Sequence, residues 1–235
     1  MIKEKHARKH LKQGVNLFCN INKALMEFNR AINLNPNLAE AYYNRSFLYS
    51  EIDDKMKDLN KAIELNPNYV EAYEMRGLLK DCFYENPRLA LVDFDTAISL
   101  EPKDSNLYIS RAKILKRLEL YDDAIIDYKK AIFLKIKKVS VWVDLGICYY
   151  LIKDFKSATK CFKRTIYKSK NNQAIGKAYK YLGYTSIEKE EDISNAVNYF
   201  KKSIKFYEKT PFSQEAPYGD LEFIYNNIND EKKKS

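Results

Sequence analysis

Two histidines near the start of the chain, His6 and His10, stand four residues apart. On a helix this spacing places both imidazoles on one face, where together they can bind a transition metal. No Glu follows the first histidine, and the sequence fixes no third ligand nearby. We therefore expect two exposed histidines on a solvated helix and no metal site.

The other residues that catalysis or cofactor binding would use lack the necessary spacing. The chain has no Gly-rich phosphate loop, no Gly-x-Ser-x-Gly turn, and no Cys/His or Asp/His constellation. Its four cysteines form no Cys-x-x-Cys pair, so they predict reduced, buried thiols at Cys19, Cys82, Cys148 and Cys161. We expect a protein that is not an enzyme and uses no cofactor.

Basic residues gather near the end of the chain and suggest a different chemistry. The formal net charge is +9, and residues 151–210 alone carry +8. Two aromatic residues, Phe162 and Tyr167, stand among Lys153, Lys156, Lys160, Lys163, Arg164, Lys168 and Lys170. RNA-binding surfaces combine cationic tracks with rings that stack on bases. The lysines also recur at spacings that would solvate an exposed helix. RNA or anionic-surface binding is therefore the alternative function, possible but not favoured.

A short helical phrase recurs six times and indicates the elements that carry all these residues. It reads Ala-Ile-x-Leu, or a degraded copy, starting at Ala31, Ala62, Ala97, Ala131, Thr165 and Ser203. The steps between copies are 31, 35, 34, 34 and 38 residues. A period of this length indicates stacked supersecondary units, whose function depends on surfaces and not on a catalytic pocket.

Units two to six also repeat a pattern of large and small side chains, whereas the first unit lacks the leading aromatic residue. In the first helix an aromatic residue precedes Ser, Gly or Ala by four positions, so bulk and gap share one helical face. In most units the second helix carries Ala and, four residues later, a ring. The chain here resembles the tetratricopeptide repeat family, whose pattern is matched nearly in full by Trp142, Leu145, Gly146, Tyr149, Ala158 and Phe162.

The resemblance covers about residues 5–209 and implies an all-α fold. That fold is a right-handed α-α superhelix, or solenoid, of about six helix-turn-helix repeats with a C-terminal capping helix. We expect the array at residues 1–211, the capping helix at 212–230 and a frayed basic tail at 231–235. The six units are expected at residues 5–38, 39–69, 70–104, 105–138, 139–172 and 176–209.

One pair of positions changes together between the copies. Units two to four have Arg just before the small residue and Asp on the second helix, whereas units five and six have Leu with Cys161 or Tyr199. Both positions are about equidistant from the turn of the hairpin, so they should face each other. The predicted ion pairs are Arg45 with Asp58, Arg76 with Asp93, and Arg111 with Asp127. A ladder of arginines that binds phosphates is the alternative.

In tetratricopeptide repeats the first helices line a concave groove. By resemblance, the groove residues here are Tyr43, Asn44, Phe47, Glu74, Lys113, Lys116, Arg117, Val143, Ile147, Tyr150 and Tyr184. Along the groove, the predicted lining would change from an acidic part at Glu74, through the three cations, to an apolar floor. That floor would suit a peptide with apolar anchors and an acidic flank. Alternatively, Val143, Ile147 and Tyr150 pack against the neighbouring unit.

Family members that hold the acidic tails of large heat-shock chaperones carry a two-carboxylate clamp. The clamp has Lys and Asn, then Asn, then Lys and Arg on three successive first helices. The matching positions here are Leu11, Val15, Asn44, Glu71 and Met75. Only Asn44 agrees, and Glu71 would repel a carboxylate. Such chaperone tails are therefore not the expected partners.

The sequence also bears on location. No stretch approaches the roughly 18 consecutive apolar residues of a membrane-spanning helix, and the first residues lack the apolar core of a secretory signal. We therefore expect no membrane insertion and a cytoplasmic protein. The predicted function is that of a non-catalytic adaptor or scaffold that binds a peptide or protein segment in its groove.

Overall fold

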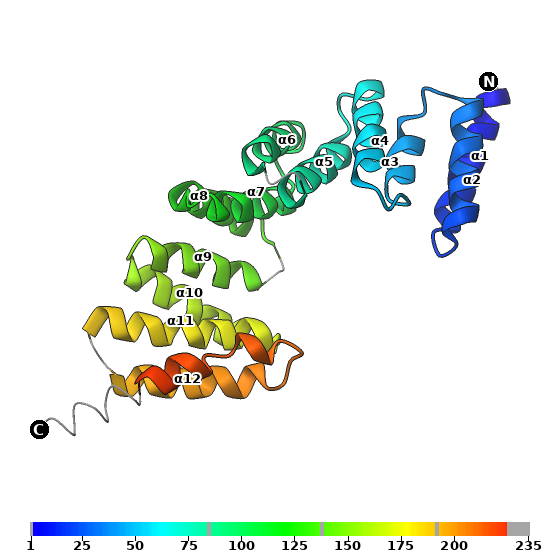
Figure 1. The fold of residues 1–235 in the computed structure, drawn as a ribbon. Coiled ribbons are helices and arrows are strands. Elements are labelled where there is room, and N and C mark those ends of the chain that lie inside the picture. The colour runs from blue at the N-terminus through cyan, green and yellow to red at the C-terminus, as the bar shows by residue number, and fades with distance from the viewer. Residues whose placement is uncertain (1, 84–85, 137–138, 191–192, 225–235) are drawn as a thin grey trace, which may run out of the picture. The chain divides into compact units, whose positions relative to one another are not determined.

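The structure is a computed structural model that describes residues 2–83, 86–136, 139–190 and 193–224 (Figure 1). Helices and turns make up all of these ranges, with no strand in the described part of the chain. The all-α repeat fold predicted from the sequence is therefore confirmed. The expected basic tail at 231–235 and the end of the expected capping helix lie outside the described residues.

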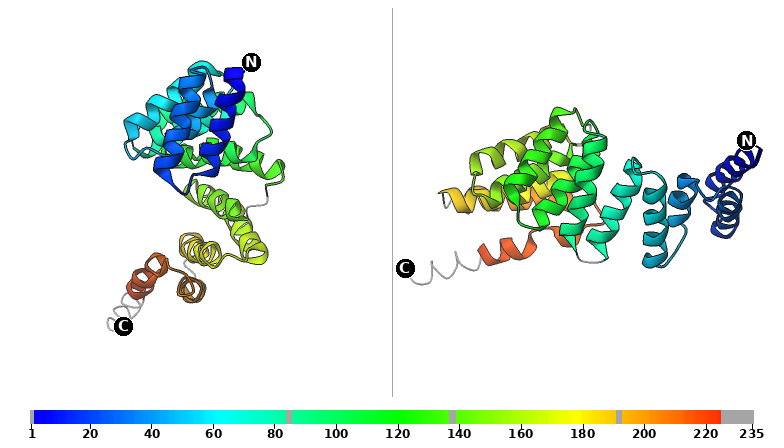
Figure 2. Two further views of the ribbon diagram at one scale, coloured as in Figure 1. Left: turned by 90° about the vertical axis from the view of Figure 1, so that its right-hand side faces the viewer. Right: turned by 90° about the horizontal axis from the view of Figure 1, so that it is seen from above.

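The helices fall into two compact units, residues 1–114 and 115–235. In the first unit, α1 pairs with α2, α3 with α4, and α5 with α6, and each pair contacts the next. Figure 2 shows these pairs from two further directions. The helices are α1 Ile2–Asn16, α2 Ile21–Leu34, α3 Ala39–Ser46, α4 Ile52–Leu65, α5 Val70–Cys82 and α6 Pro87–Leu100, followed by α7 Ser105–Arg117, which spans the division between the units.

In the second unit, α9 pairs with α10 and α11 with α12, and α8 packs against α9. The first helices α9 and α11 also contact each other directly. The helices are α8 Tyr121–Phe133, α9 Ser140–Leu151, α10 Phe155–Lys168, α11 Asn172–Glu190 and α12 Ile193–Tyr207. The boundaries of the six predicted repeats remain a proposal.

Contact between glycine and an aromatic ring sets the close approach of the two helices in a hairpin. A Cβ atom added to Gly146 would lie 2.6 Å from the ring of Phe162, so only glycine lets α9 and α10 come this close. The same pairing joins Gly77 to Phe94, with 3.0 Å between the added Cβ and the ring. The large and small residues predicted from the sequence thus form the contact surface of the α5–α6 and α9–α10 pairs.

Residues 213–224 fold back over the last helix pair. A short 3-10 helix, η1 Ser213–Glu215, precedes a helical segment at 218–224. Leu221 and Ile224 of this segment pack with Phe200 of α12 and with Tyr184 and Ile187 of α11. The segment therefore covers apolar surface that the last pair would otherwise expose to solvent.

Candidate functional site

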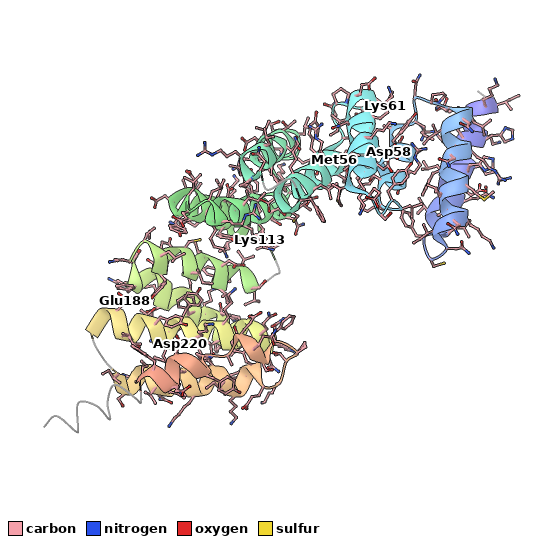
Figure 3. The ribbon with its side chains drawn as sticks, in the orientation of Figure 1. Met56, Asp58, Lys61, Lys113, Glu188 and Asp220 are labelled. Carbon is pink, nitrogen blue, oxygen red and sulfur yellow. The ribbon has the colours of Figure 1, made fainter. Side chains whose placement is uncertain are left out.

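Arg45 forms the first of the predicted ion pairs. Its Nε and Nη2 donate to the two carboxylate oxygens of Asp58, both at 2.7 Å, and its Nη1 donates to Asn29 Oδ1 at 2.7 Å. Asp58, labelled in Figure 3, is only 3% exposed. The guanidinium thus neutralises a buried carboxylate and links α4 to the preceding second helix, α2.

Arg76 repeats this arrangement in the next pair. Its Nη2 lies 2.7 Å from Asp93 Oδ1, and its Nη1 donates to Asn60 Oδ1 at 2.9 Å. Lys80 Nζ also lies 2.9 Å from Asp93 Oδ2. Because the carboxylate and amide oxygens occupy the guanidinium, Arg76 holds helices together and does not offer a phosphate site.

Arg111 has a partner that sequence reasoning missed. Its Nη1 donates to Asp95 Oδ1 of α6 at 2.7 Å. Asp95 stands where Asn29 and Asn60 stand in the earlier units, 16 residues before the arginine. The predicted pair of Arg111 with Asp127 stays a prediction, because its two residues belong to different compact units.

The predicted groove residues of the first unit are only partly available to a ligand. The Tyr43 ring packs edge-on against Phe47 at 5.0 Å, and burial raises the pKa of the Tyr43 hydroxyl. Asn44 Nδ2 donates to the backbone oxygen of Glu40 at 2.6 Å, so its amide is bonded within its own helix. Phe47 lies just beyond α3 and is exposed, while Glu74 is half-buried.

The three predicted cations of the groove have different surroundings. Lys113, labelled in Figure 3, is exposed on α7, and so is Arg117. Lys116 is half-buried, and its Nζ lies 2.7 Å from Asp144 Oδ1 of α9. Lys116 therefore already neutralises a carboxylate of its own chain.

The apolar floor expected at Val143 and Ile147 is not a surface. Val143 is 3% exposed and Ile147 is 4% exposed, and both pack with Ala174 and Ala178 of α11. The expectation of an accessible floor at these two residues is wrong, because α11 covers the face of α9 that carries them. The alternative interpretation, packing between neighbouring units, is what the structure shows.

Tyr150 and Tyr184 belong to a cluster of rings that is only partly covered. Tyr150 contacts the rings of Tyr181 and Tyr184, with centroids 5.5 and 6.3 Å apart. The Tyr184 hydroxyl donates to Asp220 Oδ2 at 3.0 Å, and burial raises its pKa. Asp220, labelled in Figure 3, lies on the helical segment 218–224. The chain's own C-terminal segment therefore occupies the ligand position expected beside Tyr184.

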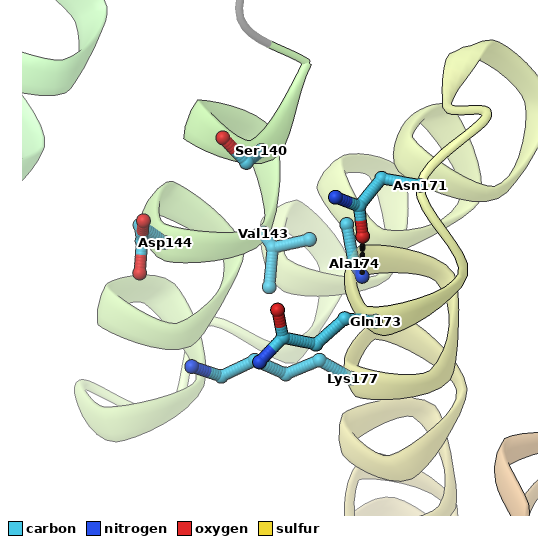
Figure 4. Close-up of a pocket in the computed structure, with 7 residues that line it drawn as sticks. All are labelled: Ser140, Val143, Asp144, Asn171, Gln173, Ala174 and Lys177. Carbon is cyan, nitrogen blue, oxygen red and sulfur yellow. Dashed lines mark hydrogen bonds between the residues drawn. The ribbon is translucent and has the colours of Figure 1, made fainter. Parts of the chain in front are cut away.

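A pocket opens between the first helices α9 and α11 (Figure 4). Its volume is about 280 Å³, and its lining is Ser140, Val143, Asp144, Asn171, Gln173, Ala174 and Lys177. Figure 4 shows Gln173 and Lys177 extending from α11 toward α9. Sequence reasoning missed Lys177. It stands two residues before the aromatic residue Tyr179, the position that supplies a clamp lysine in the family pattern, but it lies in the sixth predicted unit and not in the first three.

The residues named above for metal and nucleic-acid chemistry have the following surroundings. His10 Nδ1 lies 2.6 Å from Glu27 Oε2, and no cluster of three metal-ligating side chains occurs in the described residues. Phe162 is fully buried and cannot stack on a base, whereas Tyr167 is 80% exposed. Within the described ranges, no helix is both long and apolar enough to cross a bilayer.

Comparisons with known proteins agree with this geometry. Two family models, both described as tetratricopeptide repeat, match residues 27–60 and 105–135. Among solved structures, PilF of Pseudomonas aeruginosa is similar with a TM-score of 0.70 and 15% identity, over 92% of this chain and 98% of PilF. YrrB, described as a TPR protein with an unusual peptide-binding site, gives a TM-score of 0.66 and 21% identity, over 80% of this chain and 96% of YrrB. The structure of MamA 41-end from Desulfovibrio magneticus RS-1 gives a TM-score of 0.66 and 15% identity, over 74% of this chain and 97% of that MamA chain.

Proposed function

Since the chain is a tetratricopeptide repeat protein, a family whose repeats serve protein–protein interaction, we propose that it is a non-catalytic adaptor that binds an acidic peptide segment along its first helices. The pocket between α9 and α11 supports this proposal best. A peptide that runs across successive first helices would pass over this pocket. No cofactor is part of the proposal.

The chemistry of the pocket favours a carboxylate at its α11 side. Among the described residues, no acidic group is paired with the Lys177 ammonium, and the Asn171 amide adds a hydrogen-bond donor beside it. Gln173 Nε2 already donates to Glu215 Oε1 at 3.4 Å. On the α9 side, Lys116 already neutralises Asp144. An acidic side chain or a peptide C-terminus would gain a charge-assisted hydrogen bond from Lys177. The partly exposed ring of Tyr150, which belongs to the same compact unit as the pocket, is proposed as a further contact of such a segment.

A library of random twelve-residue peptides displayed on phage tests the proposal. We expect selection on the wild-type protein to enrich acidic peptides, and Lys177→Glu to weaken their binding by about tenfold or more. Lys163→Glu, which makes the same charge change on the exposed face of α10, is the matched control and should leave binding within about twofold.

Two outcomes would contradict the groove proposal. One is selection of peptides with no acidic preference, and the other is equal binding by the Lys177→Glu variant. The Lys177→Glu and Lys163→Glu variants also distinguish peptide binding from the alternative function, RNA or anionic-surface binding. Binding of an unrelated RNA oligonucleotide that falls steeply with salt and is lost in Lys163→Glu would favour an anionic-surface role.

A further inference from the structure

In the second predicted repeat, the Arg45 side chain is enclosed by two aromatic rings and two polar side chains. The Arg45 guanidinium lies over the Tyr42 ring at 5.5 Å and over the Tyr49 ring at 5.7 Å. Its hydrogen bonds to Asn29 and Asp58 close the remaining two sides. The guanidinium therefore fills a slot with aromatic walls between the second helices α2 and α4.

The fifth repeat has the same slot without the arginine. Leu145 stands at the position of Arg45, and Lys129 precedes it by 16 residues, as Asn29 precedes Arg45. Trp142 and Tyr149 replace the two tyrosine walls, and Cys161 stands at the position of the aspartate. Leu is shorter than Arg and Cys is smaller than Asp. The slot is consequently a cavity of about 280 Å³, bounded by Lys129, Trp142, Leu145, Tyr149, Lys160 and Cys161.

The sixth repeat fills this position in another way. It also carries Leu, at Leu182, but Tyr199 replaces the small Cys161. The Tyr199 ring stacks on Tyr179 with centroids 6.2 Å apart. Loss of the arginine alone therefore need not leave a cavity. In the fifth repeat the residue that faces the leucine is the small Cys161.

The charges around the cavity decide which ligand it fits. Arg164 stacks over the Trp142 ring at 4.1 Å, and Lys129 lies over the Tyr149 ring at 5.5 Å. Both aromatic walls thus already have a cation, and no carboxylate bounds the cavity. A cationic ligand would be repelled by Lys129, Lys160 and Arg164. An apolar group with acidic neighbours would bury its surface between the rings and pair with these three cations.

The size of the cavity points to a side chain and not to a large ligand. Pockets for drug-sized molecules are usually about 300–1,000 Å³, so this cavity lies just below that range. We propose that it is a docking site for one Phe or Leu side chain of an acidic segment of a partner protein. The site uses a different face of α9 from the pocket at Lys177 and is independent of the groove proposal.

Trp142 makes the docking site directly measurable, because it is the only tryptophan of the chain. The probe is the peptide acetyl-Glu-Asp-Glu-Phe-Glu-Asp-Glu-amide, titrated while Trp142 fluorescence is followed. We expect a saturable change at or below millimolar peptide. Replacing the central Phe by Ser, or all flanking acids by Lys, should weaken binding by about tenfold or more.

Filling the slot provides the decisive variant. The triple change Lys129→Asn, Leu145→Arg, Cys161→Asp installs the three polar residues of the second repeat and should abolish binding while circular dichroism stays helical. If the triple variant does not fold, Leu145→Phe replaces it as the test, because its ring also fills the cavity. Lys170→Asn, which has the same net charge change on an exposed residue, should bind as the wild type does.

Several results would overturn the docking site. They are equal binding of the Phe and Ser peptides, no saturation at millimolar Phe peptide, and undiminished binding by both slot-filling variants. Octanoate serves as a small amphiphile for comparison. If it saturates the change in Trp142 fluorescence at a lower concentration than the peptide does, the site binds a small amphiphile and not a protein partner. The Lys177→Glu variant should bind this probe normally, so the outcomes for the two sites remain distinguishable.

Discussion

At the scale of single residues, the buried aspartates explain why arginines recur in the early repeats. Asp58 and Asp93 lie inside the helix pairs, where an unpaired charge would be costly. Each guanidinium satisfies its carboxylate with two hydrogen bonds and uses a third to reach the preceding second helix. The arginines are therefore structural, and Leu145 leaves a slot in the fifth repeat because the aspartate position is also taken by a smaller residue, Cys161.

Replacing Arg45 alone should lower the free energy of unfolding far more than replacing both Arg45 and Asp58. We expect Arg45→Leu to lower the free energy of unfolding by about 3 kcal/mol, because Asp58 would stay buried without its partner. Arg45→Leu combined with Asp58→Cys should recover most of this loss. Urea unfolding followed by circular dichroism measures both. Arg30→Leu, at an exposed arginine, should cost less than ~1 kcal/mol. Additive losses in the double variant would argue against the coupling.

At the scale of elements, polar residues fix where several second helices begin. Asn20, Asn86 and Asp154 each accept a hydrogen bond from the backbone N–H three residues later. Such capping satisfies a donor that has no partner within the helix. For Asp154 the bond from Ser157 N is 3.0 Å long and starts α10, the helix that bounds the docking cavity.

Asp154→Ala should lower the free energy of unfolding by about 1 kcal/mol at neutral pH. Hydrogen bonds from the Ser157 hydroxyl and backbone lower the pKa of Asp154, with help from Lys156 and Lys160. Ionised Asp154 thus adds stability above its unfolded pKa of about 4, and this contribution is lost as the pH falls through the lowered folded value.

Measuring the free energy of unfolding of the wild type and of Asp154→Ala between pH 7 and pH 2 checks the direction of this pH dependence. The difference between the two proteins should shrink on acidification. Asp154→Ser keeps a capping oxygen without a titratable group, so it should be nearly as stable as the wild type at pH 7 and should lack the pH-dependent part. A difference that stays constant with pH would contradict the assignment to Asp154.

At the scale of the whole molecule, each helix pair contacts mainly the adjacent pairs. α9 contacts α8, α10 and α11, and the first helix pairs have the same kind of neighbours. The stability of such an array is approximately a sum of terms from single pairs and from neighbouring pairs. A defect in one pair should therefore loosen its neighbours more than remote pairs.

Gly146→Val tests this locality. The new side chain would collide with Phe162, which should lower the free energy of unfolding by about 2 kcal/mol or more. Hydrogen exchange measured by mass spectrometry should become faster in α8 to α11 and change little in α1 to α4. Gly219→Val is the matched control, because no atom lies within 4 Å of its added Cβ. Equally faster exchange in all helices would contradict a locally coupled array.

The sequence by itself determined the repeat period, the helix pairs and the ion pairs at Arg45 and Arg76. These contacts join residues 13 and 17 positions apart, within one repeat, and each repeat shows its own pattern in the sequence. The tertiary structure alone decided which groove residues a ligand can reach. It buried Val143 and Ile147 under α11, paired Lys116 with Asp144, and placed the C-terminal segment over Tyr184.

The physical reason is that burial depends on the next repeat along the array, whose packing a single-repeat pattern does not contain. The pocket at Lys177 and the cavity at Trp142 show the same limit. Their walls come from two successive helix pairs, which no single repeat contains. The coupled change of Arg and Asp to Leu145 and Cys161 was visible in the sequence. Whether small side chains leave a cavity or a neighbour fills it was settled only by the packing.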